Sequence, residues 1–130
     1  MTHKKQTQGC IGIVGLGLIG GSLGLELKDL GWYVKGLVHK PLTVEKATKK
    51  QLVHEVSTDS KILSDCDLVI LALPLKQLLQ PNKILVNALP KSAVITDVGS
   101  VKEPIVKVWE RLHPRFVGSH PMSGTEQSGV

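Results

Sequence analysis

The chain has 130 residues, a net charge of +5 at pH 7 and hydrophobic residues at 42% of positions. This length suits one compact domain, and the balance of apolar and charged residues excludes disorder for most of the chain. The polar opening residues lack the apolar stretch of a secretory signal, and no apolar run is long enough for a membrane helix. We therefore expect a soluble, cytoplasmic protein with no membrane partner.

The positive charge favours anionic ligands, but its sign alone does not choose between nucleic acid, nucleotide and acidic metabolite. Aromatic residues make up 3% of the chain, so stacking surfaces for nucleic acid are scarce and no nucleic-acid partner is expected. Cys10 and Cys66 each lead into an apolar run and have no partner at zinc-finger or C-x-x-C spacing. We predict two small buried apolar side chains, with neither a disulfide framework nor a metal site.

After a polar tail over residues 1–9, apolar runs alternate with helical patterns along the chain. The predicted strands cover 10–14, 33–38, 52–56, 68–73, 93–96 and 115–118, and the predicted helices cover 18–30, 43–50, 78–89 and 104–112. The run at 52–56 is the weakest of these. Such alternation predicts an α/β fold with a doubly wound parallel sheet, forming one dinucleotide-binding domain over residues 10–130.

A glycine-rich loop follows the first predicted strand. Residues 15–20 read GLGLIG, which matches G-x-G-x-x-G between a strand and a helix, the context in which this pattern indicates dinucleotide binding. Gly15 permits the turn, Gly17 lets a pyrophosphate approach the backbone, and Gly20 allows close packing of helix on strand. The alternative is a glycine turn that only packs closely.

The end of the second predicted strand bears on the choice of cofactor. Dinucleotide folds that bind NAD usually carry Asp or Glu here, whereas residues 38–41 read VHKP. With no carboxylate to repel a 2′-phosphate, and with Lys40 and His39 available to pair with it, the sequence predicts NADP. The alternative is an ordinary solvated lysine. The predicted cofactor-binding residues are Gly15, Gly17, Leu18, Ile19, Gly20, His39, Lys40, Thr43, Leu73 and Pro74.

Two later loops carry the candidate catalytic groups, because ligands bind at the carboxyl ends of the strands in such sheets. His120 follows the last predicted strand and has the titration range of a general base, although a lone histidine is more often structural. Ser100 either contacts substrate or caps the next helix, since residues 100–103 read SVKE. Lys102 is expected to be a solvated lysine of the first helical turn.

The sequence resembles the prephenate/arogenate dehydrogenase family of tyrosine biosynthesis. The resemblance rests on GLGLIGGSLG at 15–24, DVGSVK at 97–102 and GSHPMSGTEQSG at 118–129, in this order. It implies an NADP-dependent oxidative decarboxylation, of arogenate to tyrosine or of prephenate to 4-hydroxyphenylpyruvate. By this resemblance, His120 takes the proton of the ring hydroxyl as hydride passes to nicotinamide, Ser100 contacts the same hydroxyl or orients the histidine, and Thr125 and Glu126 line the substrate pocket.

Two departures from the family pattern shape what we expect of this chain. His39 and Lys40 stand where many members have a carboxylate, which favours NADP and the arogenate branch. The chain stops at Val130, so the helical domain through which family members form homodimers is expected to be absent, leaving a piece with poor turnover. The alternatives are an NADP-linked dehydrogenase of the β-hydroxyacid type and a non-catalytic NADP-binding module.

Overall fold

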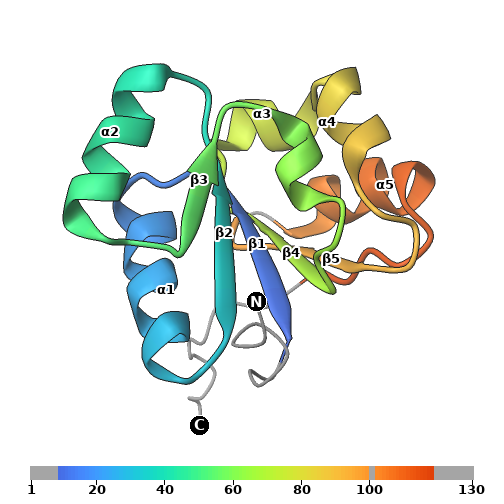
Figure 1. Ribbon diagram of the computed structural model, residues 1–130. Helices are drawn as coiled ribbons and strands as arrows, with labels where there is room; N and C mark the ends of the chain where they lie inside the picture. Colours follow the sequence, from blue (N-terminus) through green and yellow to red (C-terminus); the bar gives the residue numbers. More distant parts are fainter. Residues whose placement is uncertain (1–8, 100–101, 119–130) are drawn as a thin grey trace, which may run out of the picture.

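The computed structural model describes residues 9–99 and 102–118. Five parallel strands form one sheet in the order β3-β2-β1-β4-β5 (Figure 1). The order reverses after β1, so the chain winds outward first to one edge of the sheet and then to the other. This arrangement confirms the predicted doubly wound α/β fold.

The elements follow the predicted alternation. The strands are β1 (Cys10–Val14), β2 (Tyr33–Leu37), β3 (Glu55–Ser57), β4 (Leu68–Leu71) and β5 (Val94–Asp97). The helices are α1 (Leu18–Asp29), α2 (Pro41–Lys50), α3 (Leu75–Leu79), α4 (Lys83–Ala88) and α5 (Lys102–Leu112), with a short 3-10 helix, η2 (Ser60–Leu63).

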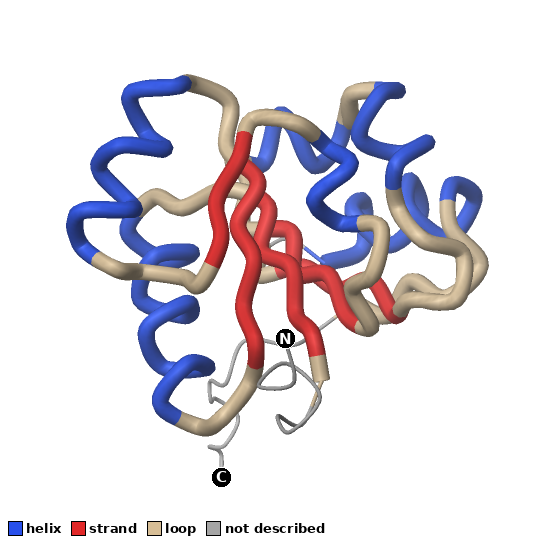
Figure 2. The backbone as a smooth tube through the Cα atoms, in the orientation of Figure 1, coloured by secondary structure: helices blue, strands red, loops and turns tan. Residues whose placement is uncertain are grey.

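Helices cover both faces of the sheet and bury a hydrophobic core on each (Figure 2). Ile11 and Ile13 of β1 point to one face and pack with α1 and α2. Cys10 and Val14 point to the other face, where η2, α3, α4 and α5 pack. All five residues of β1 are buried, because this strand lies at the centre of the sheet with helices on both faces.

Three predicted elements differ from the structure. The segment at 78–89, predicted to be helical beyond Pro81, contains α4 and the end of a separate helix, α3. The two helices are separate because Pro81 cannot donate the backbone hydrogen bond that would join them, and the Asn82 side chain caps α4, accepting from Ile84 N–H at 2.7 Å. The strand predicted at 52–56 begins at Glu55. The sixth strand is reduced to one parallel bridge between Ile95 and Phe116.

No helix in the described part of the chain is long and apolar enough to cross a membrane. The predicted tail at 1–9 lies outside the described residues except for Gly9.

Candidate functional site

The four longer strands end level with one another at the carboxyl edge of the sheet. Val14 of β1 is in register with Leu37 of β2 and with Leu71 of β4, and Leu71 is in register with Asp97 of β5. The loops that follow these strands therefore start side by side. The structure thus brings to one edge of the sheet the starts of the loops after β1, β2 and β4, which carry the predicted cofactor-binding residues, and the start of the loop after β5, which leads toward Ser100.

The glycine loop leaves no room for side chains at two of its positions. Gly15 has φ +97°, and a Cβ there would lie 2.5 Å from the carbonyl oxygen of Ala72. A Cβ at Gly20 would lie 1.9 Å from the carbonyl oxygen of Gly15. Both approaches are far inside van der Waals contact, so the turn from β1 into α1 requires glycine at each position. This agrees with the packing roles predicted for Gly15 and Gly20.

Gly17 is different, because a Cβ added there would meet no atom of the described residues 9–99 and 102–118 within 4 Å. It is the N-cap residue of α1, which has neither a side-chain cap nor an acidic residue in its first turn. Leu18 and Ile19 follow it with largely exposed side chains. The open space therefore faces backbone N–H groups at a helix N-terminus, and this arrangement fits the phosphates of a dinucleotide.

His39 and Lys40 lie exposed just beyond the end of β2. Lys40 is the N-cap residue of α2 and has extended backbone, with Pro41 as the first helical residue. Thr43 is half-buried in the first turn of α2, and its N–H donates to the carbonyl oxygen of Lys40 at 3.0 Å. Residues 38–43 contain no carboxylate.

Leu73 and Pro74 follow β4 beside the glycine loop. Leu73 packs on the core, and its Cδ2 would be 3.4 Å from a Cβ at Gly15. Pro74 is exposed and is the N-cap residue of α3. Leu73 therefore borders the glycine loop, and Pro74 begins the next helix at the same edge of the sheet.

An ion pair at the end of β5 was not predicted. Asp97 is fully buried, and one of its carboxylate oxygens accepts from Lys102 Nζ at 2.6 Å and from Gly99 N–H at 2.7 Å. The side chain of Lys102 is 15% exposed. The prediction of a solvated lysine is therefore wrong, because the ammonium group compensates a carboxylate that has no access to water. The pattern of residues 97–102 carries no signal for this pairing, which depends on how α5 docks after β5.

The remaining predicted residues, Ser100, His120, Thr125 and Glu126, lie outside the described residues. Their catalytic and substrate-binding roles stay predictions.

Residues 23–130 match the family described as "Prephenate dehydrogenase, nucleotide-binding domain". The chain belongs to the prephenate dehydrogenase family. A relative from Bacillus subtilis, named prephenate dehydrogenase, is 34% identical and matches 100% of this chain. Among solved structures, Synechocystis arogenate dehydrogenase is 36% identical over 90% of the chain with a TM-score of 0.73. Prephenate dehydrogenase from A. aeolicus, in complex with hydroxyphenyl propionate and NAD+, is 33% identical over 95% of the chain with a TM-score of 0.78.

The chain spans less than half the length of these relatives. It covers 36% of the Bacillus subtilis protein, 42% of the Synechocystis chain and 45% of the A. aeolicus chain. The match is to the nucleotide-binding domain of the family, which agrees with the predicted dinucleotide-binding fold.

Proposed function

We propose that this protein binds NADP at the glycine loop and takes part in the oxidative decarboxylation of arogenate or prephenate. The observation that carries the proposal is the open space beside Gly17 at the N-terminus of α1. The flanking Gly15 and Gly20 admit no side chain, so they hold the loop in this shape. Backbone N–H groups there can donate to a pyrophosphate, and the helix dipole favours its charge. Membership of a family described by its nucleotide-binding domain supports a nucleotide as the ligand.

The choice of NADP rests on the end of β2. His39 and Lys40 are exposed there, and residues 38–43 have no carboxylate to repel a third phosphate group. A lysine ammonium and a phosphate form charge-assisted hydrogen bonds, which are stronger than neutral ones. The A. aeolicus relative has been crystallised with NAD+, so cofactor preference is the feature in which this chain would depart from that relative.

The proposed chemistry needs one base beside the bound cofactor. A nicotinamide bound at this edge supplies a hydride acceptor. His120 would accept the proton of the substrate's ring hydroxyl, and Ser100 would contact that hydroxyl or orient the histidine. Thr125 and Glu126 would line the substrate pocket. Loss of carbon dioxide then leaves an aromatic ring, which makes the overall reaction favourable.

Calorimetric titration of the chain with NADP and with NAD tests the binding step. We expect saturable binding of both, with NADP preferred. Lys40→Gln should weaken NADP binding roughly ten- to hundredfold, the range for a hydrogen bond between charged groups, and leave NAD binding nearly unchanged. Lys46→Gln is the matched control, because it removes one positive charge from an exposed position on the same helix. Equal affinities for the two cofactors would remove the NADP assignment, and no binding by folded protein would remove the glycine-loop site.

Measurements of turnover test the catalytic step. They use the longest form of the protein that contains this chain. Arogenate and prephenate are compared as substrates, with reduced cofactor followed by absorbance. We expect His120→Asn to lower kcat by about a hundredfold or more, the usual contribution of a general base, without changing cofactor affinity. His54→Gln is the control, because His54 lies next to β3 and away from the carboxyl edge. Unchanged turnover in His120→Asn would exclude this residue as the base.

A further inference from the structure

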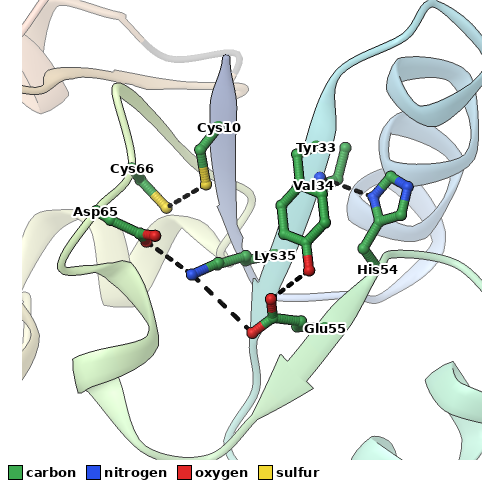
Figure 3. A network of polar contacts seen from close by, with 8 residues as sticks. All are labelled: Cys10, Tyr33, Val34, Lys35, His54, Glu55, Asp65 and Cys66. Atoms are coloured by element: carbon green, nitrogen blue, oxygen red, sulfur yellow. Dashed lines mark hydrogen bonds and ion pairs between the residues drawn. The ribbon is translucent and has the colours of Figure 1, made fainter. Parts of the chain in front are cut away.

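A cluster of polar and sulfur-containing side chains lies at the opposite, amino-terminal end of the sheet (Figure 3). Cys10 is the first residue of β1, and Cys66 precedes β4 by two residues. Their Sγ atoms are 3.6 Å apart, and the two residues are only 5% and 4% exposed. One side-chain oxygen of Asp65 lies within 4.8 Å of both sulfur atoms. We propose that Cys10, Cys66 and Asp65 form a site for a thiophilic divalent cation of the zinc type.

The separation of the two thiols fits this class of ion. Zinc bonds to thiolate sulfur at about 2.3 Å with tetrahedral angles, which places two sulfur ligands about 3.8 Å apart. The 3.6 Å between Cys10 and Cys66 needs almost no adjustment to meet this requirement. A carboxylate oxygen is an accepted third ligand for zinc. Within the described residues the cluster supplies three ligands, so a water molecule would complete the tetrahedron.

The packing around Cys66 holds its sulfur in place. A Cβ at Gly12 would lie 2.9 Å from Cys66 Sγ and 2.7 Å from Leu63 Cδ2, so the sulfur occupies the space above this glycine. Gly12 and Cys10 lie on the same face of β1, which brings the sulfur of Cys66 directly beside that of Cys10. Cys10 therefore belongs to the rigid central strand, and the sulfur of Cys66 packs against that strand. Rigid elements are how effective metal ligands are positioned.

The charges around the cluster suit a bound dication. Lys35 is buried in the middle of β2, and its Nζ lies 2.7 Å from Asp65 Oδ1 and 4.0 Å from Glu55 Oε1. Two thiolates and one carboxylate exceed the charge of a dication by one negative charge, which the ammonium group of Lys35 balances. Lys35 also orients Asp65, as groups around a metal site commonly orient a ligand.

A metal ion here would link the start of β1 to the segment that leads into β4. The cluster lies at the end of the sheet away from the glycine loop, so a bound ion should stabilise the fold without changing cofactor affinity. The proposal departs from the sequence-based expectation of no metal site, which rested on the 55 residues between the two cysteines and on the lack of a neighbouring ligand at metal-binding spacing. Parallel pairing of β1 with β4 brings them together.

Titration of the reduced, metal-free chain with Cd2+ tests the proposal, because cadmium thiolates absorb in the near ultraviolet. We expect a thiolate band that saturates at one ion per chain and is displaced by Zn2+ but not by Mg2+. Cys10→Ser and Cys66→Ser should each remove most of the band, and Asp65→Asn should weaken binding about tenfold or more as a charged ligand is lost. Glu45→Gln is the control, because it removes a carboxylate from exposed α2 on the other face of the sheet.

Alkylation of the wild-type chain gives a second measurement that needs no variant to fold. Zn2+ should slow the modification of both cysteines, followed by mass spectrometry, and should raise the melting temperature of the wild type but not of Cys66→Ser. Absence of a thiolate band from folded, reduced protein would overturn the proposal. So would a disulfide between Cys10 and Cys66 that persists in the presence of a phosphine reductant, because the pair would then be a covalent link rather than a metal site.

Discussion

Gly17 and Gly20 belong to one loop but differ in what an added methyl group would meet. At Gly20 a Cβ would lie 1.9 Å from a backbone oxygen, whereas at Gly17 it would enter open space. We expect Gly20→Ala to destabilise the fold by about 3 kcal/mol or more, because backbone atoms must move. We expect Gly17→Ala to change stability by less than about 1 kcal/mol and to weaken NADP binding about tenfold, because the methyl group occupies the space for phosphate.

Urea denaturation and calorimetric titration of the two variants measure these opposite effects. Gly20→Ala should change mainly the free energy of unfolding, and Gly17→Ala mainly the affinity for NADP. If Gly17→Ala binds NADP as the wild type does, the loop serves only the packing of α1 on β1.

The surroundings of His54 should make the free energy of unfolding fall as the pH falls. Its ring stacks on Tyr33 with centroids 4.6 Å apart, and Nδ1 accepts from Val34 N–H at 2.9 Å. Burial and the nearby charge of Lys28 lower the pKa of His54 below its usual value, against the opposing charge of Glu55. The unfolded chain therefore takes up this proton first as the pH falls.

This contribution to stability is complete above about pH 7 and is lost as the pH falls through the unfolded value of about 6.5 toward the folded pKa. Replacing His54 by glutamine should flatten this part of the profile. Free energies of unfolding in urea at pH 7.5 and pH 5.5 measure the difference between the two proteins. A variant whose loss of stability over this range equals that of the wild type would assign the dependence to other groups.

At the scale of elements, the sequence predicted strands well where both faces are covered. The runs at 10–14 and 68–71 are continuously apolar because helices pack on both sides of the sheet. The prediction failed at the edges, where β3 pairs with β2 through three residues and the segment at Phe116 forms a single bridge. Short edge strands depend on their neighbours for hydrogen bonds, and their own residues carry little signal.

The same limit applies to the candidate site. The spacing of the glycines predicted the turn between β1 and α1. The close contact that requires glycine at position 20 is with Gly15 of the same loop, so the signal is local in the sequence. The pairing of Asp97 with Lys102 depends on how α5 docks after β5, which the pattern of residues 97–102 does not reveal. The docking itself is fixed elsewhere, because Trp109 of α5 is fully buried and its Nε1 donates to the carbonyl oxygen of Leu78 in α3 at 2.9 Å.

The buried ion pair predicts a large effect of a single substitution at the start of α5. Lys102→Met leaves the fully buried carboxylate of Asp97 without its positive partner, which typically costs about 3 to 5 kcal/mol. The double variant Asp97→Asn, Lys102→Met should recover part of this loss, because an amide can be buried at lower cost. Urea denaturation of the two single variants and the double variant measures the coupling. Additive effects would indicate that the pair contributes no mutual stabilisation.

At the scale of the whole molecule, the doubly wound topology separates two kinds of chemistry. Parallel strands collect the loops for a phosphorylated ligand at their carboxyl ends, and the thiol cluster lies at their amino ends. A ligand at one end should therefore act on the other only through the stability of the shared sheet. NADP and Zn2+ should each raise the melting temperature by mass action, and with no direct contact their effects on unfolding free energy should add.

The net charge of +5 predicts how the two nicotinamide cofactors will differ in salt. NADP carries one more phosphate group than NAD, and exposed Lys40 and His39 would face that group, so screening by salt should weaken NADP binding more steeply. We expect titrations at roughly 0.05 M and 0.5 M NaCl to show a several-fold larger loss of affinity for NADP than for NAD. In Lys40→Gln the loss of affinity with added salt should become nearly equal for NADP and NAD, because the lysine charge that would interact with the additional phosphate group of NADP is gone. Parallel slopes in the wild type would mean that the overall positive field, and not Lys40, governs binding of both.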